Sequence, residues 1–482
     1  MNRLPFLLFL LFLLASCTMH EQKTSSIVIK TSPDRDLIYW FSGIDYLSDY
    51  EQGYCRSEKA KTDSAGIFVT EFDIDKPVTF NIGRVNKTIM SVLPVHVTPG
   101  SRDTIIISGD SIIFNGTNAS YNRYLQVTEA FLDYCNQLLI MRPSDDPLFQ
   151  TKIFSDFEKA LNEKRTDAEK KISQSGLDAP FIEEQLAHLD FSSRMAIIVK
   201  SLFLMQDSLM PDDWKQAIKK VLNEPIESPY FRSYREISFF LNYYIALDYR
   251  EEHGNTKDLK YLSFAVFDKL TERLSGKNLE CAWATIINND MCYKKYNPAV
   301  PDLYMMLKEK FPENTYQSIL NSGIKENYRF NEQSTTDISD DDYQFLSCDS
   351  SFISLTDVTA QLKGKVVYVD LWATWCGSCL EQFQYLSALK EKTKDLDIIQ
   401  LYISIDKPEL KERWQKSVYH YSLKGSHLLA SPKLRESILK EFGNYIPHYV
   451  IVNKDGLIVE PNAPYPEKTD ELYEKLLHWS NN

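Results

Sequence analysis

Residues 366–379 read Val-Val-Tyr-Val-Asp-Leu-Trp-Ala-Thr-Trp-Cys-Gly-Ser-Cys. The first half is an almost continuous apolar run, which is typical of a central strand that is covered on both faces. Apolar residues then recur at the spacing of the buried side of a helix, at Leu380, Phe383, Leu386 and Leu389. The pattern predicts a buried strand, a Cys-x-x-Cys turn and a helix in direct succession.

The two cysteines of this pattern lie where a dithiol redox site needs them. Cys376 would lie at the N-terminus of the helix, where unpaired N–H groups and the helix dipole stabilise a thiolate. Cys379 would follow one turn later, close enough to attack a mixed disulfide formed by Cys376. We therefore expect Cys376 to react with the substrate and Cys379 to resolve. The Cys376–Cys379 disulfide would be the redox group, with no other cofactor.

The competing interpretation of a Cys-x-x-Cys pair is a structural zinc site, which normally needs a second pair of ligands at suitable spacing. No cysteine follows Cys379 in the chain. The histidines beyond it are not spaced as a ligand pair: His420, His427, His448 and His478. The sequence therefore favours a redox site, and we assign no metal ligand.

The chain as a whole shows several regions with different patterns. Residues 27–118 contain short β-rich runs separated by turn residues, which suggest a small β-sandwich-like domain. Residues 119–326 show apolar spacing near the helical period, with prolines between the periodic segments, and are predicted to be helical. Residues 327–343 are polar and acidic and are expected to form a linker. Residues 344–482 alternate strand and helix patterns, which predicts an α/β domain with a central sheet.

The N-terminus has the features of a secretory signal peptide over residues 1–16. Arg3 precedes an apolar run that is too short to span a bilayer as a mature helix. Leu14-Ala15-Ser16-Cys17 resembles the bacterial lipobox, in which the cysteine becomes the acylated first residue. We expect lipidation at Cys17, a tether over residues 17–26 and a location outside the cytoplasm, where disulfides persist. The alternative is an ordinary signal peptide that has a cysteine near its cleavage site.

The composition is that of a folded, acidic protein. Of the 482 residues, 43% are hydrophobic and 25% are charged, which excludes a collagen-like or wholly disordered chain. The 54 basic and 67 acidic residues leave a net charge of −13, and no run of Lys and Arg is longer than two. We therefore expect no nucleic-acid partner.

The Trp-Ala-Thr-Trp-Cys-x-x-Cys motif, with Gly364-Lys365 before the strand, resembles the extracytoplasmic TlpA/ResA branch of thioredoxin-fold proteins. The succession of a lipobox, a β domain, a helical middle region and this C-terminal domain is similar to TlpA-like lipoproteins of the Bacteroidetes. The resemblance implies a thioredoxin fold over residues 344–482. It also implies a lipid-anchored thiol–disulfide oxidoreductase of the cell envelope that faces the periplasm and reduces protein disulfides. A membrane thiol reductant of the DsbD/CcdA type would supply the electrons.

The resemblance also implies further site residues. Asp370 matches the buried aspartate that exchanges a proton with the second cysteine, and burial would raise its pKa toward the range useful for proton transfer. The alternative is a strand-end aspartate that points to solvent, which the apolar surroundings of Asp370 disfavour. Ile446-Pro447 matches a cis-proline that precedes a strand beside the dithiol. Substrate contacts are expected from five residues: Trp375, Gly377, Ser378, Ile446 and Pro447.

The sequence departs from the family pattern in the predicted helix. ResA-like proteins usually have Glu three residues after the second cysteine and Pro two residues further on, where this chain has Gln382 and Gln384. Glu381 lies one residue early, and such a shift turns a helical side chain by about 100°. Ser378 replaces the proline common in thioredoxin, which restores a backbone N–H and adds a hydroxyl near Cys376. We expect a more oxidising couple than that of a Cys-Gly-Pro-Cys site.

Two other functions remain open. A peroxiredoxin-like peroxidase would have a Thr three residues before its reactive cysteine, whereas Thr374 lies two residues before Cys376. The other alternative is a ligand-binding lipoprotein, in which the large N-terminal portion captures a ligand and the redox domain is accessory.

Five more cysteines follow the lipobox: Cys55, Cys135, Cys281, Cys292 and Cys348. Cys281 and Cys292 lie close enough in sequence to pair, but buried thiols are the preferred interpretation. We assign none of the five a role.

Overall fold

The computed structural model describes residues 23–33, 36–42, 58–74, 77–86, 89–109, 111–139, 153–206, 211–233, 241, 259–313, 316–333, 342–347, 352–443 and 445–481. The predicted signal peptide, Cys17, Cys55 and Cys348 lie outside these ranges, as does part of the expected linker. None of the described helices combines the length and the apolar character that a membrane span requires.

The chain divides into two compact units. The first consists of Met1–Asn289 and Asp302–Asn321, and the second of Asp290–Pro301 and Ser322–Asn482. Helices α9, α10 and α11 each cross a boundary between the units along the chain. The second unit therefore contains short segments of the region that was expected to belong wholly to the helical middle.

The strands of the first unit form two four-stranded sheets, in the orders β4-β1-β7-β8 and β3-β2-β5-β6. Alternation along the strands buries Ile27 and Ile29 of β1 with Phe80 and Ile82 of β5 in one hydrophobic core. The expected strand-rich region is therefore present. The strands are β1 (Lys23–Lys30), β2 (Asp36–Ser42), β3 (Glu58–Lys61), β4 (Ile67–Ile74), β5 (Val78–Asn86), β6 (Ile89–Val97), β7 (Arg102–Ser108) and β8 (Ser111–Gly116).

The expected tether over residues 17–26 is wrong at its C-terminal end, because strand β1 begins at Lys23. Ser25 is fully buried there, and its hydroxyl donates to the Thr98 carbonyl at 3.1 Å and accepts from the Gly100 N–H at 2.9 Å. A polar residue that finds partners inside the fold is compatible with a strand. The polar composition of residues 17–26 indicated a tether, because the sequence does not show that Ser25 finds these partners in the folded chain.

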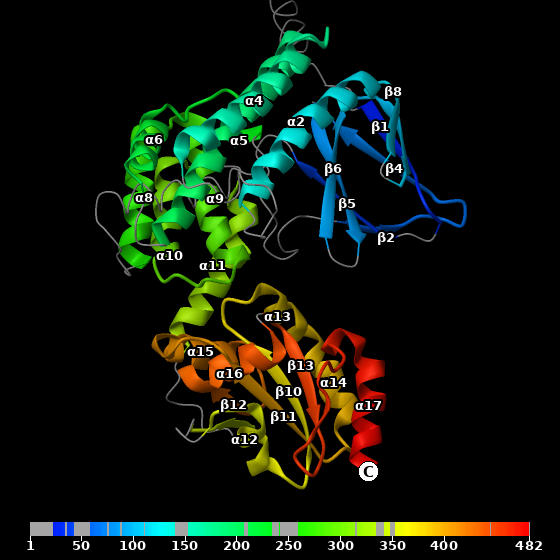
Figure 1. Cartoon of the computed structure of the whole chain (residues 1–482), viewed down its shortest axis with the longest axis vertical. Coiled ribbons are helices and arrows are strands. Elements are labelled where there is room, and N and C mark those ends of the chain that lie inside the picture. Colours follow the sequence, from blue (N-terminus) through cyan, green and yellow to red (C-terminus); the bar gives the residue numbers. More distant parts are fainter. Residues whose placement is uncertain are drawn as a thin grey trace, which may run out of the picture. The chain divides into compact units, whose positions relative to one another are not determined.

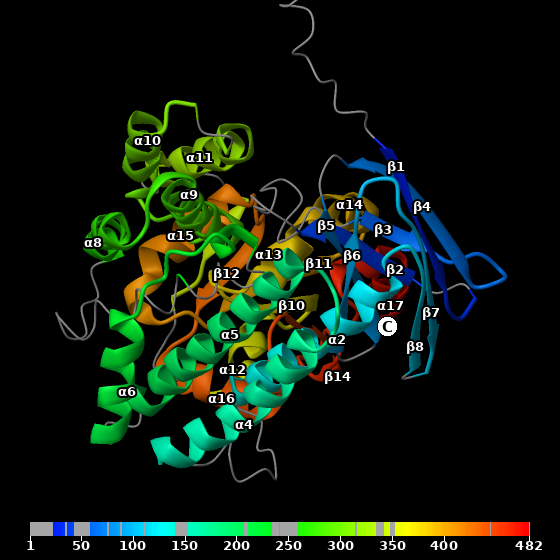
Figure 2. The ribbon, with the colours of Figure 1, turned by 90° about the horizontal axis from the view of Figure 1, so that it is seen from above.

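The helices of the first unit bury apolar faces against one another, and Trp214 packs edge-on against Phe154 at 5.1 Å between ring centres. Helix α2 packs against both α5 and strand β6, as Figures 1 and 2 show. The helices are α2 (Ala119–Leu139), α4 (Phe154–Ser173), α5 (Ala179–Gln206), α6 (Asp212–Asn223), η2 (Phe231–Ser233) and α8 (Leu259–Arg273), with α9 (Gly276–Cys292), α10 (Val300–Lys310) and α11 (Gln317–Glu332) shared with the second unit. Helix α11 continues past residue 326, so the expected linker begins too early in the chain.

The second unit is built on a six-stranded mixed sheet with the order β14-β13-β10-β11-β12-β9. Strand β10 pairs parallel with β11 and antiparallel with β13, and all seven of its residues are buried. This confirms the predicted central strand covered on both faces. The strands are β9 (Tyr343–Phe345), β10 (Val366–Trp372), β11 (Ile398–Ser404), β12 (Gly425–Leu429), β13 (His448–Val452) and β14 (Ile458–Glu460).

Helices cover both faces of this sheet (Figure 1). Val367 and Val369 of β10 share one core with residues of α12, α15 and α16, whereas Val366 and Tyr368 share another with residues of α14 and α17. The helices are α12 (Leu355–Thr359), η3 (Ala360–Leu362), α13 (Gly377–Gln382), η4 (Phe383–Tyr385), α14 (Leu386–Thr393), η5 (Pro408–Leu410), α15 (Lys411–His420), α16 (Pro432–Phe442), η6 (Pro466–Lys468) and α17 (Thr469–Asn481).

The helix predicted after the two cysteines is present but divided into α13 and α14 by the tighter turn η4. Phe383 begins this turn and is buried against Trp372, with 5.3 Å between the ring centres. The apolar spacing therefore located the buried side correctly, while the tight turn inside the helical pattern was not foreseen.

Candidate active site

Cys376 and Cys379 are joined by a disulfide at the start of helix α13, with 5.2 Å between their Cα atoms. Strand β10 leads into the turn that carries Cys376, and Cys376 is the N-cap residue of the helix. Its sulfur accepts a hydrogen bond from the Cys379 N–H at 3.1 Å. The N–H group stabilises negative charge on this sulfur when the disulfide is open.

The two sulfur-bearing residues differ in accessibility. Cys376 is 5% exposed and Cys379 is fully buried, whereas the neighbouring Trp375 is 54% exposed. Gly377 and Ser378 are also exposed, and the Ser378 hydroxyl lies 3.6 Å from the Cys376 sulfur. A partner that approaches from solvent therefore meets Trp375 and the Cys376 side of the disulfide first.

Asp370 lies in the middle of β10, opposite Tyr402 of β11 and Tyr449 of β13. Its side chain is fully buried, and neither carboxylate oxygen has a hydrogen-bond partner among the described residues. Burial raises the pKa of the Asp370 carboxyl well above its usual range. The expected burial is therefore present, and the alternative of a strand-end aspartate in solvent does not hold.

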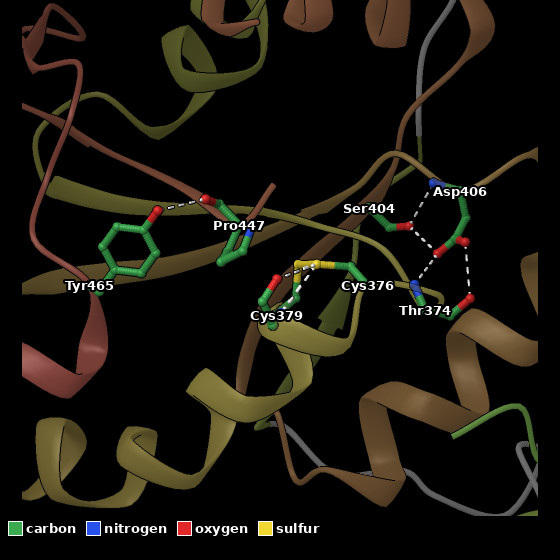
Figure 3. Close-up of a disulfide and its surroundings, with 8 residues drawn as sticks. Thr374, Cys376, Cys379, Ser404, Asp406, Pro447 and Tyr465 are labelled. Carbon is green, nitrogen blue, oxygen red and sulfur yellow. Dashed lines mark hydrogen bonds between the residues drawn. A yellow bond between two sulfur atoms is a disulfide. The ribbon is translucent and has the colours of Figure 1, made fainter. Parts of the chain in front are cut away.

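The Ile446–Pro447 peptide bond is cis, as the sequence pattern implied. Pro447 directly precedes β13, whose first residue, His448, pairs with Leu371 of β10. This register brings Pro447 to the end of β10 from which the chain continues to Cys376, and Figure 3 shows Pro447 in the surroundings of the disulfide. The Tyr465 hydroxyl donates to the Pro447 carbonyl at 3.2 Å.

A buried polar cluster that sequence reasoning missed holds the turn before Cys376. Asp406 accepts from the Thr374 N–H and the Thr374 hydroxyl, both at 2.9 Å, and from the Ser404 hydroxyl at 2.7 Å (Figure 3). All three residues are buried. The available signal was a pair of polar residues where the apolar strand β11 ends, Ser404 and Asp406, because they meet the neighbouring strand end at the same edge of the sheet.

The remaining cysteines of the described chain take no part in this site. Cys281 is buried, is not disulfide-bonded, and has its sulfur 4.0 Å from the Thr285 hydroxyl. Cys292 is likewise not disulfide-bonded, so the two do not pair.

Comparison with known proteins bears on this geometry. Residues 350–477 match the family model described as Redoxin. These residues form a Redoxin domain. The match includes the central strand, both cysteines and the cis-proline, and the second unit accordingly has a thioredoxin fold of the kind found in thioredoxin-like oxidoreductases.

Curated relatives of the Redoxin domain are described as the thiol–disulfide oxidoreductase ResA. The thiol–disulfide oxidoreductase ResA of a Bacillus cereus strain is 29% identical over 103 residues, which are 20% of this chain and 55% of the relative. ResA of Bacillus thuringiensis subsp. konkukian is 31% identical over 118 residues, which are 24% of this chain and 63% of the relative. The chain thus spans little more than half the length of the curated relatives it matches.

A solved structure is also similar. The thioredoxin domain of a thiol–disulfide oxidoreductase from Bacteroides vulgatus is 26% identical and covers 25% of this chain and 83% of its own, with a TM-score of 0.22.

The Redoxin domain makes contacts with residues of the second unit that precede the matched range. The Tyr296 hydroxyl donates to Glu326 at 2.7 Å and lies 2.6 Å from the Tyr421 hydroxyl. His420 lies 3.2 Å from the same Glu326 oxygen, within hydrogen-bond distance. Burial raises the pKa of both tyrosines, which therefore stay neutral.

Two side chains connect this polar cluster with the disulfide region. Tyr421 packs against Phe383 of η4, with 5.5 Å between the ring centres. Arg413 donates to the Lys294 carbonyl at 3.0 Å and to the Thr374 carbonyl at 3.2 Å. The turn before Cys376 is thus held by Asp406 from within the Redoxin domain and by Arg413, which also contacts a segment outside it.

Proposed function

We propose that the protein is a thiol–disulfide oxidoreductase in which Cys376 is the nucleophile and Cys379 the resolving cysteine. The observation that carries the proposal is the disulfide at the N-terminus of α13, in which Cys376 is 5% exposed and Cys379 is fully buried. This asymmetry lets a substrate reach one sulfur and leaves the other for the intramolecular step.

The reaction passes two electrons from the dithiol to the substrate. The Cys376 thiolate attacks a substrate disulfide, forms a mixed disulfide and releases one substrate thiolate. Cys379 loses its proton and attacks the Cys376 sulfur, which releases the second substrate thiolate and forms the Cys376–Cys379 disulfide. Asp370 would exchange the Cys379 proton, since burial favours its neutral form and sets its pKa above that of an exposed aspartate.

The surroundings of the disulfide suit an extended polypeptide as substrate. Trp375, Gly377 and Ser378 are exposed around Cys376, and Pro447 directly precedes the strand that pairs with β10. We assign substrate contacts to these residues and to Ile446. Protein disulfides of the cell envelope are the proposed substrates, and reduction is the proposed direction.

The proposed location is the outer face of a membrane. The lipobox-like sequence before Cys17 supports removal of residues 1–16 and acylation of Cys17. A membrane thiol reductant of the DsbD/CcdA type is the proposed electron donor. Labelled palmitate should enter the wild-type protein and not a Cys17→Ser variant, and equal labelling of both would refute the anchor.

Reduction of insulin disulfides tests the activity. We expect Cys376→Ser to lose the activity of the wild type, because no other described cysteine is placed to attack a substrate and be resolved by Cys379. Cys135→Ser is the matched control, since Cys135 is buried in helix α2 of the other unit. Equal activity of the wild type and Cys376→Ser would refute the proposed oxidoreductase activity.

A Cys379→Ser variant tests the assignment of the two roles. It should accumulate mixed disulfides with its substrates through Cys376, because the resolving step is blocked. Mass spectrometry of the trapped species identifies both the substrate and the cysteine that holds it. Trapping by Cys376→Ser instead would reverse the two roles.

A further inference from the structure

The first unit contains a cavity of about 410 Å³ that the redox chemistry does not use. Its walls come from strands β5 and β6, from helices α2 and α5, and from the segment around Tyr230. This volume lies within the range of about 300–1,000 Å³ that is usual for small-molecule sites. None of its lining residues belongs to the second unit.

Two buried polar side chains in this cavity each have an oxygen without a hydrogen-bond partner in the part of the chain that the structure describes. Thr128 of α2 is 1% exposed and Gln185 of α5 is 4% exposed. The Thr128 hydroxyl and the Gln185 side-chain carbonyl oxygen have no hydrogen-bond partner among the described residues. Buried polar groups are nearly always paired in native proteins, and an amide oxygen can only accept. A ligand that donates hydrogen bonds would satisfy both groups.

An aromatic wall stands on one side of the cavity. His96 stacks on Tyr121 with 5.2 Å between ring centres, and Phe181 packs edge-on against Tyr121 at 5.0 Å. Asp178 fixes this wall, because it accepts from the Tyr121 hydroxyl and from the Phe181 N–H. Aromatic faces attract organic cations and provide contact area for apolar groups.

The charges that line the cavity are mostly negative. The described lining residues include three with carboxylates, Glu129, Asp178 and Glu184, and one with a guanidinium, Arg232. The hydrogen bond from Tyr121 holds the pKa of Asp178 below its usual range, so this carboxylate is ionised. Burial lowers the pKa of His96, which is therefore neutral and adds no positive charge.

We propose that this cavity is a binding site for a small organic amine in its protonated form that carries an apolar or aromatic body. The ammonium N–H groups would be donors to the Gln185 oxygen and the Thr128 hydroxyl, the carboxylates would supply the opposite charge, and the aromatic wall would contact the body. The site is independent of the disulfide, so it stands or falls separately from the oxidoreductase function.

Isothermal titration of the full chain with three probes of similar size tests the proposal. The probes are 2-phenylethylamine, the neutral 2-phenylethanol and the anionic 3-phenylpropionate. We expect the amine to bind at least tenfold more tightly than either of the others. Equal or tighter binding of the anion overturns the proposal, and so does an amine that shows no binding up to about 10 mM, the weakest affinity a ligand of this size should have.

Variants locate the binding. The double variant Thr128→Val/Gln185→Leu keeps the side-chain volumes and removes both polar groups, and we expect it to weaken amine binding at least tenfold. Thr166→Val/Gln174→Leu is the matched control, since both residues are exposed near helix α4, and it should bind as the wild type does. Unchanged amine binding by Thr128→Val/Gln185→Leu would overturn the proposal that the amine binds in this cavity.

Glu184→Gln provides a second variant, in case the double variant does not fold. It removes one charge without changing shape, and its exposed counterpart is Glu163→Gln. We expect Glu184→Gln to weaken the amine and leave 2-phenylethanol unaffected. An equal loss for both probes would reject the electrostatic selection.

Discussion

At the scale of single residues, the surroundings of Asp370 change the chemistry of its carboxyl group. Its carboxyl is fully buried and has no hydrogen-bond partner among the described residues, and burial raises its pKa well above the usual range. The unfolded chain releases this proton near pH ~3.9, whereas the folded chain keeps it to higher pH. The contribution of Asp370 to the free energy of unfolding therefore falls as pH rises above about 4, by about 1.4 kcal/mol per pH unit, until the folded-state pKa of Asp370 is reached.

We expect Asp370→Asn to remove this contribution to the pH dependence. The variant should be more stable than the wild type near neutral pH, and the difference should shrink as pH falls toward about 4. Urea unfolding of the oxidised protein at a series of pH values measures it. The exposed Asp395→Asn is the control and should keep the wild-type pH slope. A constant difference across the series would contradict a raised Asp370 pKa.

The Ser378 hydroxyl lies 3.6 Å from the Cys376 sulfur. We expect Ser378→Pro to make the couple more reducing, because the variant loses this hydroxyl and a backbone N–H that stabilise the thiolate of the reduced form. A tenfold change in the equilibrium with glutathione corresponds to about 30 mV. Ser378→Ala, which loses the hydroxyl alone, should lie between the two, and an unchanged or higher potential in Ser378→Pro would contradict the role.

The residues of the site divide into those that sequence could reveal and those that it could not. Cys376 and Cys379 follow from short-range spacing on one strand and one helix, and Asp370 follows from the resemblance to the TlpA/ResA branch. Asp406 lies 32 residues from Thr374, and Tyr296 lies 125 residues from Tyr421, so their contacts depend on how the sheet and helices assemble. The polar residues at the end of β11 are a local signal for Asp406, but nothing local in the chain marks its partner Thr374 or the Tyr296–Tyr421 pair.

At the scale of elements, the turn between β10 and α13 is held by hydrogen bonds rather than by a regular structure. Thr374 donates twice to Asp406, and the Ile405 N–H donates to the Trp372 carbonyl at 2.9 Å. These bonds attach the end of β10 to the segment after β11. They therefore fix the position of Trp375 and Cys376 relative to the sheet.

We expect Thr374→Val to slow insulin reduction several-fold and to lower the free energy of unfolding by about 1–3 kcal/mol, because an Asp406 oxygen loses a buried donor. Thr393→Val is the matched control. Thr393 is also buried, and its hydroxyl donates to the Leu389 carbonyl at 2.9 Å, but it lies in helix α14. The control should lose stability without a comparable loss of the reduction rate per folded molecule, whereas an equal loss of rate in both would remove the positioning role of Thr374.

The boundaries of helices and strands are the part of the fold that the sequence pattern predicts least well. The apolar spacing after Cys379 predicted one helix, and the structure divides it at Phe383 because that ring packs against Trp372. Helical periodicity is insensitive to a single turn of tighter pitch, since the buried side chains shift by only a fraction of a turn. Strand β1 likewise begins within a polar segment because of a tertiary contact, the hydrogen bond from the Ser25 hydroxyl to the Thr98 carbonyl.

At the scale of the whole molecule, the unit that contains the disulfide is larger than its Redoxin domain. It includes Asp290–Pro301 and the chain from Ser322 onward, although the family match begins at residue 350. Tyr296 stacks on Phe330 with 3.9 Å between ring centres, and its hydroxyl bonds with Glu326 and Tyr421. A boundary at residue 344, as the sequence pattern suggested, would separate these partners.

This organisation predicts that two Tyr→Phe changes close together in the chain act on different units. Tyr296→Phe removes a hydroxyl that serves Glu326 and Tyr421 in the second unit, whereas Tyr304→Phe removes one that donates to Asn321 at 2.6 Å in the first. A buried group left without its partner costs about 1–3 kcal/mol, which is roughly a 5- to 150-fold change in the opening equilibrium.

Amide hydrogen exchange resolved by peptide measures where each change acts. Tyr296→Phe should speed exchange in β10 and β11 by that factor and leave α5 as in the wild type, and Tyr304→Phe should leave β10 and β11 unchanged. Because both variants lose one hydroxyl and nothing else, the comparison isolates the unit to which the hydroxyl belongs. Faster exchange in α5 alone, or in both units alike, after Tyr296→Phe would show that residues 290–301 do not belong to the folding unit of the disulfide.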